Sequence, residues 1–443
     1  MTKYSEINQI IRFYPTNIDT LNCEEVWSSE SFNLFVYIPF CRRKCHFCIL
    51  NSAKLSKKKI DVFFKALDKE LMLYEDTAYF KSKLVNSLWI GGGTPSVVPI
   101  DKIKCLLDHS MQNFNFTNNA EITIEVNLED LDENFLKQIV DTKINRLSIG
   151  VQTFNNKYLK ILGRTYNFDN ILYVFDLLSK FSELDISIDL MYRYPGQTIE
   201  ELVEDLEYIK RIDLIQHVTI HPLILFPSLE LYKKIKSGIL PKQPSLKRYL
   251  EMYNILLDNL SNGKPFYQYS PYSFAKKDKE CAYNISRWRI PQQECLSIGP
   301  GGFSQANNYI YCTEHDIDKY MEIVGKGIIP ILEGKKLNYR EMLSRYLVIG
   351  SRLLSVDLDM YRELTGFEAR ELFKDSFNWL LKEGLININD NKMDLTDKGK
   401  ALIIDVSKAF YSENVEVLQP QYRILNLYQK GSNNLLSDVI ENE

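Results

Sequence analysis

The sequence LFVYIPFCRRKCHFC, residues 34–48, decides how the rest of the chain is interpreted. Its first five residues are apolar, β-branched or aromatic, which is typical of a buried strand, and Pro39 ends the run. Cys41, Cys45 and Cys48 follow on a short loop, four and then three positions apart. Thiolate sulfur is the ligand that zinc and iron–sulfur clusters prefer. The spacing therefore predicts a metal or cluster site directly after a strand.

The residues of the loop are compatible with two kinds of metal centre, a zinc ion and an iron–sulfur cluster. Structural zinc is closed by four Cys or His ligands, usually in two pairs, and the sequence has no second such pair. His46 directly follows Cys45, so its ring would have to point away from a centre that Cys45 and Cys48 both bind. Three cysteines on a four-iron cluster leave one iron open, which is typical of a reactive site. A disulfide is a poor interpretation, because no export signal is present and a reducing compartment is expected.

The loop resembles that of the radical S-adenosylmethionine (SAM) superfamily, with Phe47 as the aromatic residue before the third cysteine. The surrounding sequence is similar to the branch that contains oxygen-independent coproporphyrinogen III oxidase, haem-chaperone-like proteins and class C radical methyltransferases. The resemblance implies a [4Fe–4S] cluster held by Cys41, Cys45 and Cys48, with SAM at the open iron. It covers about residues 30–410 and defines the cofactors far better than the substrate.

Strands and helices alternate after the cysteine loop. Strands that alternate with helices of ten or more residues form right-handed βαβ units and a parallel sheet. With the strand at 34–38 there are six units, so the predicted fold is α/β, a partial (β/α)6 barrel that stays open. We expect the further strands at 85–90, 122–126, 146–150, 186–190 and 218–224, and helices at 60–74, 101–113, 131–140, 155–181 and 198–210.

The less regular remainder predicts additional parts around the barrel. A polar turn between apolar runs at 385–395 indicates a hairpin within a set of helices, which favours a winged-helix-like accessory domain near the C-terminus. The predicted organisation is an N-terminal strap at 1–33 containing RFYPTN, the barrel at 34–228, a barrel-closing and substrate-covering region at 229–339, the accessory domain at 340–412, and a tail at 413–443.

Polar groups follow the predicted strands, at the edge where functional residues of a parallel sheet collect. The segment Gly91–Thr94 follows the second strand, while Glu125, Gln152 and Asp189 stand at the ends of the next three. Consecutive glycines let a ligand touch the backbone, since no Cβ holds it off. A buried carboxylate such as Glu125 needs a cationic or hydroxylated partner. Arg164 is the candidate, either in a mutual salt bridge or through a shared ligand.

The resemblance implies a role for each of these groups. The glycine segment would bond the amino group of the SAM that chelates the open iron, and Glu125 and Arg164 would contact the same molecule. Gln152 and Asp189 match residues that hold a second SAM in the coproporphyrinogen oxidase. The expected cofactor contacts are Phe35, Phe47, Gly91, Gly92, Gly93, Thr94, Glu125, Gln152, Arg164 and Asp189.

Departures from the branch bear on the substrate. Tyr37 stands where oxidase and chaperone patterns have His, and Ile49-Leu50 stand where oxidase-type sequences have a further Cys and chaperone-like ones an Asp. YNISRW, residues 283–288, resembles a His-Asn-x-x-Tyr-Trp haem motif in which Tyr283 replaces the His and Arg287 the Tyr. Loss of the imidazole weakens the case for haem ligation.

Two other stretches, residues 225–241 and 289–311, resemble class C methyltransferases and their relatives. We therefore expect a radical SAM enzyme that binds two SAM molecules and transfers a methyl or methylene group to an sp² carbon of a small molecule. One alternative is a tetrapyrrole enzyme that decarboxylates propionates or opens haem. Another is a haem-binding, chaperone-like protein. An electron donor such as flavodoxin or ferredoxin is an expected partner.

The composition and net charge limit the classes of protein and of partner that remain. The 443 residues, 45% hydrophobic and 25% charged, predict an ordinary globular protein with one large and one smaller domain. A net charge of −4 gives no field to attract nucleic acid or anionic lipid, so neither is expected as a partner. No apolar stretch approaches the roughly 20 residues that span a bilayer, and a cytoplasmic location is predicted. We interpret Cys23, Cys105, Cys281, Cys295 and Cys312 as small buried hydrophobic residues.

Overall fold

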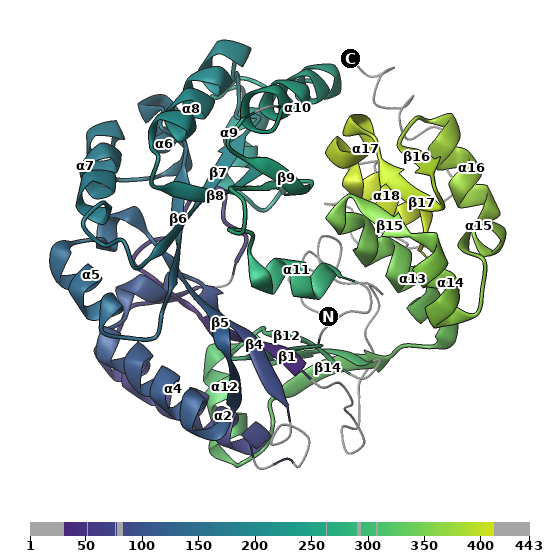
Figure 1. Cartoon of the computed structure of the whole chain (residues 1–443). Coiled ribbons are helices and arrows are strands. Elements are labelled where there is room, and N and C mark those ends of the chain that lie inside the picture. Colours follow the sequence, from purple (N-terminus) through teal and green to yellow (C-terminus); the bar gives the residue numbers. More distant parts are fainter. Residues whose placement is uncertain are drawn as a thin grey trace.

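The computed structural model describes residues 31–50, 52–75, 77, 83–262, 264–289, 294–306 and 309–411. The RFYPTN segment of the expected strap and the expected tail lie outside the described residues, as does Cys23. Figure 1 shows an α/β molecule in which helices cover the outside of a curved sheet. Within the described part of the chain, every helix is too short or too polar to cross a lipid bilayer.

Six parallel strands in chain order form the centre of the sheet. The sheet has 12 strands, and its two end strands, β14 and β9, do not pair among the described residues, so the barrel is open. This confirms the predicted α/β fold with a partial barrel. The central strands are β1 (Ser31–Ile38), β4 (Leu84–Gly92), β5 (Asn115–Val126), β6 (Arg146–Gln152), β7 (Asp185–Tyr192) and β8 (Ile215–Pro222).

The helices between these strands cover the outer face of the sheet (Figure 1). Leu34, Val36 and Ile38 alternate along β1 and are fully buried in the same apolar core as Phe63 and Leu67 of α2. This alternation is why the strand keeps one face toward the helices. The helices are α2 (Lys57–Glu75), α4 (Ile100–Asn113), α5 (Glu133–Val140), α6 (Asn156–Leu162), α7 (Phe168–Leu178) and α8 (Ile199–Arg211).

One predicted boundary differs markedly from the structure. β5 begins at Asn115 rather than at residue 122, because polar residues at its start pair with β4 and carry no apolar pattern. The helices expected across 155–181 are α6 and α7. Gly163 ends α6 with a φ of 78°, in the left-handed region, and the Asn167 side chain caps α7.

The region from 229 to 339 lengthens the sheet at both edges without joining its ends. β9 (Tyr267–Ser270) and β10 (Ser273–Ala275) extend the edge at β8. At the other edge β11 (Glu294–Ile298) lies parallel to β1, followed by β12 (Phe303–Ala306), β13 (Tyr309–Thr313) and β14 (Ile331–Lys336). Its helices are α9 (Glu230–Lys236), α10 (Leu246–Leu260), α11 (Ala282–Trp288), which lies inside the curve of the sheet, and α12 (Ile317–Gly325).

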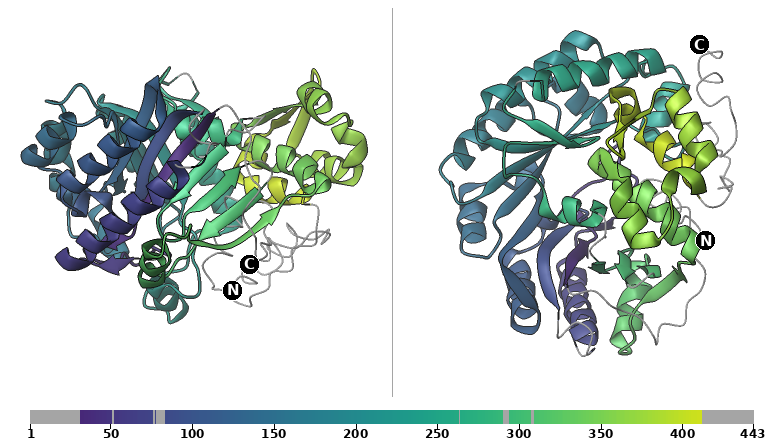
Figure 2. Two further views of the ribbon diagram at one scale, coloured as in Figure 1. Left: turned by 90° about the horizontal axis from the view of Figure 1, so that it is seen from below. Right: turned by 45° about the vertical axis from the view of Figure 1, so that its right-hand side comes forward.

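The C-terminal unit lies at the open side of the sheet (Figure 2). Its hairpin of β16 (Ile386–Asn389) and β17 (Lys392–Leu395) turns at Asp390 and Asn391, which both have positive φ. Tyr249 of α10 donates a hydrogen bond to the Ala401 carbonyl at 2.7 Å and ties the unit to the barrel. The remaining elements are α13 (Tyr339–Gly350), β15 (Ser355–Asp357), α14 (Leu358–Thr365), α15 (Ala369–Leu372), α16 (Lys374–Lys382), α17 (Asp397–Ala401) and α18 (Ile403–Ala409).

The scattered cysteines are only partly where the sequence predicts them. Cys281, Cys295 and Cys312 are buried, in agreement with their interpretation as small hydrophobic residues. Cys105 is exposed on α4, so that expectation was wrong for this residue. Its neighbours Leu106 and Leu107 occupy the buried face of the amphipathic helix and leave Cys105 on the outer face.

Candidate cluster and cofactor site

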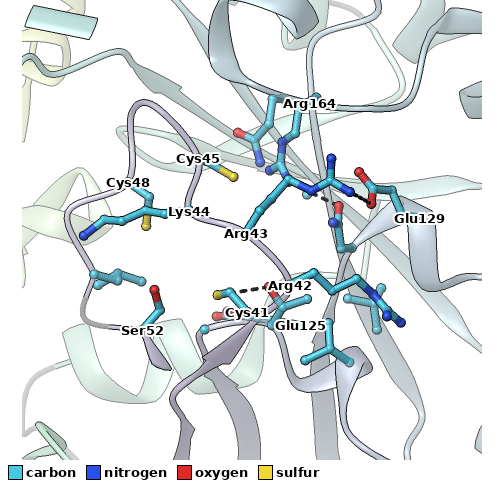
Figure 3. Close-up of a pocket in the computed structure, with 18 of the residues that line it drawn as sticks. Cys41, Arg42, Arg43, Lys44, Cys45, Cys48, Ser52, Glu125, Glu129 and Arg164 are labelled. Carbon is cyan, nitrogen blue, oxygen red and sulfur yellow. Dashed lines mark hydrogen bonds and ion pairs between the residues drawn. The ribbon is translucent and has the colours of Figure 1, made fainter. Parts of the chain in front are cut away.

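A cavity of about 210 Å³ lies at the carboxyl ends of the central strands (Figure 3). Residues from β4, β5, β6 and β7 and from the cysteine loop meet there, as expected for a parallel sheet. Of the residues predicted from the sequence, those that line the cavity are Cys41, Cys45, Phe47, Cys48, Gly92, Gly93, Thr94, Glu125, Gln152, Arg164 and Asp189. Phe35 and Gly91 do not line it.

The three loop cysteines face one space inside the loop (Figure 3). Cys41 is the second residue of β2 (Phe40–Cys41), which pairs in parallel with β3 (Ala53–Lys54) and so fixes the base of the loop. The Cys48 amide donates to the Cys45 carbonyl at 3.2 Å and forms the turn between them. The Thr94 hydroxyl donates to Cys41 Sγ at 3.5 Å. The loop is therefore shaped by local backbone bonds and by the segment after β4.

The arrangement of the thiols favours a cluster over a single ion. Among the described residues, no three Cys, His, Asp or Glu side chains are close enough to hold one metal ion. Thiolates on one tetrahedral zinc would lie about 3.8 Å apart, given Zn–S bonds of about 2.3 Å. In a four-iron cluster each thiolate binds a different iron, so the sulfurs lie farther apart. The three cysteines therefore fit a cluster.

His46 is held away from the thiols. Its Nδ1–H donates to the Ile161 carbonyl at 2.9 Å, and its backbone amide donates to the Leu162 carbonyl at 3.1 Å. A Cβ at Gly163 would lie 3.1 Å from the His46 ring, so the glycine that ends α6 also makes room for this contact. His46 fastens the cysteine loop to α6, and the ring has no path to a ligand position.

Burial controls the protonation of the loop thiols. It raises the pKa of the Cys48 thiol to about 11. Burial also raises the pKa of Cys41, and the hydrogen bond from Thr94 opposes part of this increase. Metals bind thiolates, so these thiols would lose their protons when a cationic metal centre binds.

Two ion pairs hold the outer side of the loop against the segment after β5. Arg42 Nε lies 2.8 Å from Asp130 Oδ1, and Arg43 Nη2 lies 3.2 Å from Glu129 Oε2. Asp130 is almost completely buried and also accepts from the Ser96 hydroxyl at 2.7 Å. A carboxylate with this many partners is a fixed anchor, so the loop is positioned before any cofactor binds.

Glu125 is oriented by the strand beside it. Its carboxylate accepts from Trp89 Nε1 at 2.8 Å and from the Gly92 amide at 3.2 Å. A Cβ on Gly91 would lie 2.6 Å from Glu125 Oε1, so Gly91 must be glycine to admit this carboxylate. Gly91 therefore supports the site from behind and has no direct place in the cavity.

The other two glycines of the run also have protein neighbours that require them. Gly92 has a φ of 107°, and a Cβ there would lie 2.9 Å from the Tyr37 ring. A Cβ on Gly93 would lie 2.6 Å from the Phe40 carbonyl oxygen. Close packing against β1 and β2 thus explains the glycines without a ligand, although Gly92 and Gly93 also line the cavity.

Arg164 enters the cavity beside the cysteine loop. Its Nη1 donates to Asn127 Oδ1 at 3.2 Å, and its guanidinium lies over the rings of Phe47 and Tyr166. Its Nε is buried without a hydrogen-bond partner among the described residues. Arg164 lines the cavity, and its planar guanidinium is suited to an anionic group of a ligand, such as a carboxylate.

Gln152 and Asp189 lie side by side at the ends of β6 and β7. Gln152 has a φ of 70°, which is unfavourable for a residue with a side chain, and the Tyr194 hydroxyl donates to its carbonyl at 2.8 Å. Asp189 accepts from the Ser148 hydroxyl at 2.9 Å. Both side chains line the cavity, so the strained turn serves to present polar groups there.

Phe35 lies deeper inside the barrel. Its ring is 6.0 Å from that of Tyr283 on α11, and Tyr283 in turn lies 5.5 Å from the Trp89 ring. Arg287 Nη1 donates to the Tyr283 hydroxyl at 2.9 Å. The structure therefore places Phe35 in an apolar layer below the cavity, because the carboxyl end of β1 lies several residues beyond it. The two altered positions of the haem-like motif contact each other there.

Sequence reasoning missed several residues of the site. They share a signal, because each stands at or near the carboxyl end of a strand, where alternate side chains also turn inward. At the ends of the third, fourth and fifth strands only one residue each was selected from the sequence. The missed residues are Trp89, Asn127, Glu129, Ser148 and Gly150, of which Trp89 acts through Glu125 and the others line the cavity.

The open parallel sheet and the three-cysteine loop define a radical SAM domain. Residues 35–209 match the model of the radical SAM superfamily, and they form such a domain in this chain. Members of this superfamily bind a [4Fe–4S] cluster and SAM. The resemblance stated from the sequence is confirmed at this level.

More particular likenesses come from whole-length relatives. The chain is similar to the heme chaperone HemW of Bacillus subtilis, with 26% identity over 86% of this chain and 99% of the relative. HemW of Lactococcus lactis is 27% identical over 86% and 97%. Oxygen-independent coproporphyrinogen III oxidase of Synechocystis is 24% identical over 92% and 90%. Among solved structures, coproporphyrinogen III oxidase (HemN) of Escherichia coli has a TM-score of 0.75 at 22% identity over 86% and 90%, which shows a common fold.

Proposed function

We propose that the chain is a radical SAM protein that binds SAM in the cavity beside Cys41, Cys45 and Cys48 and takes a tetrapyrrole as substrate or cargo. The observation that carries the first part is the meeting, in one cavity, of the three loop thiols with the Glu125 carboxylate and the Arg164 guanidinium. The second part rests on the relatives, several of which are named heme chaperones. These relatives support the tetrapyrrole alternatives better than the methyl transfer first expected.

The chemistry that the bound cofactors would supply is one-electron reductive cleavage of SAM to methionine and a 5′-deoxyadenosyl radical. The chain's own residues hold the reactants. Arg164 presents a planar donor to the SAM carboxylate, and Glu125, fixed by Trp89, accepts from an ammonium or hydroxyl group.

A reconstitution experiment tests the first part. Under anaerobic conditions with iron, sulfide and a reductant, the protein should bind a [4Fe–4S] cluster and convert SAM to 5′-deoxyadenosine. Cys45→Ala should lose both the cluster spectrum and the product. Cys105→Ala is the matched control, because Cys105 is also free but exposed on a distant helix, and it should behave as the parent chain. A zinc-loaded protein that ignores SAM would refute the proposal.

The tetrapyrrole is tested by titration with haem and with coproporphyrinogen III. Haem that binds with a shifted Soret band and is recovered intact supports a carrier. Haem that is consumed together with SAM supports an enzyme. Propionate decarboxylation has weaker support, because Ile49 and Leu50 stand where oxidase-type sequences have a further Cys. Absence of binding by either tetrapyrrole would contradict this part.

Transfer of a methyl or methylene group is a second candidate. It is supported by Gln152 and Asp189, two polar residues that line the cavity together and match residues that hold a second SAM in the coproporphyrinogen oxidase. A stoichiometry of two bound SAM molecules, reduced to one by Asp189→Ala, would support it. Formation of S-adenosylhomocysteine with a substrate would establish methyl transfer, and a single SAM in the parent chain would count against this candidate.

A further inference from the structure

The cysteine loop and the segment after it form a strongly basic run. Between Cys41 and Ile60 there are seven cationic residues and no acidic one, although the whole chain has a net charge of −4. Six of the seven are exposed. The basic run consists of Arg42, Arg43, Lys44, Lys54, Lys57, Lys58 and Lys59.

The fold gathers this run around the thiols. In the β2–β3 pair, Lys54 stands directly opposite Cys41. α2 begins three residues later with Lys57, Lys58 and Lys59, so its first turn adjoins the base of the loop. The cations of the loop, β3 and the first turn of α2 are therefore continuous with the segment that would hold a cluster.

Most of this charge is not neutralised. Arg42 and Arg43 are paired with carboxylates, and Lys59 pairs with Asp318 at 2.8 Å. No ion pair involves Lys44, Lys54, Lys57 or Lys58 within the described ranges of the chain. An unbalanced patch of one sign attracts a partner of the opposite sign and speeds its association.

The three lysines at the start of α2 stand at the end of the helix where the helix dipole disfavours positive charge. The N-terminus of a helix carries partial positive charge, where acidic residues stabilise and basic residues destabilise. No acidic residue occupies the first turn of α2. Helix stability therefore does not explain these lysines, whereas an acidic partner would be attracted by the dipole and the lysines together.

We propose that the basic run is the docking face for an acidic, low-potential, one-electron carrier protein. The inference rests on the proposed function, because the carrier gives up one electron and the cluster on the three cysteines takes it up. Lys54, Lys57 and Lys58 do not line the cavity, so a small ligand bound there would not explain them. A protein surface is large enough to contact the loop, β3 and the start of α2 at once.

Stopped-flow reduction of the reconstituted protein tests this face. The probes are flavodoxin hydroquinone and reduced ferredoxin, which distinguish a flavin from an iron–sulfur carrier, with dithionite as a small reductant. Lys57→Glu/Lys58→Glu should lower the second-order rate constant with the preferred carrier about tenfold at low salt and weaken its salt dependence. Reduction by dithionite should be unchanged, and the thermal midpoint should be equal or higher because the helix dipole is relieved.

The control is Lys374→Glu/Lys382→Glu, which makes the same charge change on exposed lysines at the two ends of α16. Equal rate constants for the two double variants with both carriers would overturn the docking face. The docking face would also be overturned if the Lys57→Glu/Lys58→Glu variant lost binding to anionic vesicles or to an oligonucleotide while its carrier kinetics stayed unchanged. The lysines would then bind another kind of partner. If dithionite-reduced protein cleaves SAM in these cases, the proposed function stands and only the docking face fails. A chain that holds no cluster would refute both.

Discussion

The guanidinium carbon of Arg164 lies 5.6 Å from the centre of the Phe47 ring. Phe47 stands between the second and third loop cysteines, and Arg164 follows α6, so this contact joins the cluster loop to the far side of the cavity. Tyr166 supports the same guanidinium at 5.7 Å. The arginine is thus held by two rings at the wall of the cavity.

Replacement of Arg164 tests this arrangement. Arg164→Lys keeps the positive charge but loses the planar donor and its stacking, so the Kd for SAM should rise about tenfold or more. Equilibrium dialysis of the reconstituted protein measures it, with unchanged iron content showing that the loop is intact. Arg211→Lys, which removes a similar contact over Tyr208 on α8, is the control. Equal SAM affinity in both variants would rule out a direct role for Arg164.

The hydrogen bond from Trp89 to Glu125 should also affect SAM binding. Trp89→Phe keeps an aromatic ring beside Tyr283 but removes the donor that orients the carboxylate. We expect SAM affinity to fall about tenfold to a hundredfold, which is the effect of losing one hydrogen bond to a charged group. Tyr283→Phe, which keeps both the ring and the Trp89 donor, should bind SAM normally. A larger loss in Tyr283→Phe than in Trp89→Phe would disprove this relation.

Stability should depend on pH through Glu70 of α2. Glu70 is fully buried, accepts from the Gly299 amide and the Tyr320 hydroxyl, and burial raises its pKa from 4.5 to about 7. The folded state therefore keeps a proton that the unfolded state has released, so stability falls as pH rises from about 4.5 to about 7. Glu70→Gln removes this dependence. Relative to the parent, its free energy of unfolding should gain about 3 kcal/mol between about pH 5 and pH 8.

Denaturant unfolding at a series of pH values measures this gain. Glu363→Gln is the control, because Glu363 is exposed on α14. It should leave the pH profile as in the parent chain. A Glu70→Gln profile parallel to that of the parent would mean that Glu70 is already charged in the folded protein.

The C-terminal unit depends on a glycine. A Cβ on Gly399 of α17 would lie 1.8 Å from the Leu385 carbonyl oxygen, which is backbone and cannot turn aside. Gly399→Ala should lower the free energy of unfolding by about 3 kcal/mol, because the helix must move off the β16–β17 hairpin. Gly325→Ala, where no atom lies within 4 Å of the added Cβ, should be close to neutral. Thermal unfolding followed by circular dichroism compares the two, and equal midpoints would contradict the packing described.

The barrel could be predicted because each of its strands and helices has its own sequence pattern. Apolar runs of strand length alternate with amphipathic helices, and polar residues at the strand ends mark the site. The pairing of β1 with β11 could not be predicted this way, because Phe32 and Glu294 are neighbours only in space. The start of β5 was missed for a related reason, since its polar residues pair with β4 without an apolar pattern.

The site shows the same division between local and tertiary information. The cysteines, Glu125 and Arg164 were found because residue type and position each pointed to them. The reason for Gly91 was not visible, because it depends on where the Glu125 carboxylate lies in space. The placement of Phe35 could not be predicted either, because both faces of β1 are apolar. Only the packing of α11 shows that the Phe35 ring lies below the cavity.

The proposed function depends most on the cysteine loop, and the yield of 5′-deoxyadenosine tests this loop directly. Reconstituted protein, SAM and dithionite should give 5′-deoxyadenosine in the parent chain and in Cys105→Ala, and none in Cys45→Ala. A parent chain that contains zinc, or that carries a cluster but neither binds nor cleaves SAM, would show that the protein is not a SAM-cleaving enzyme.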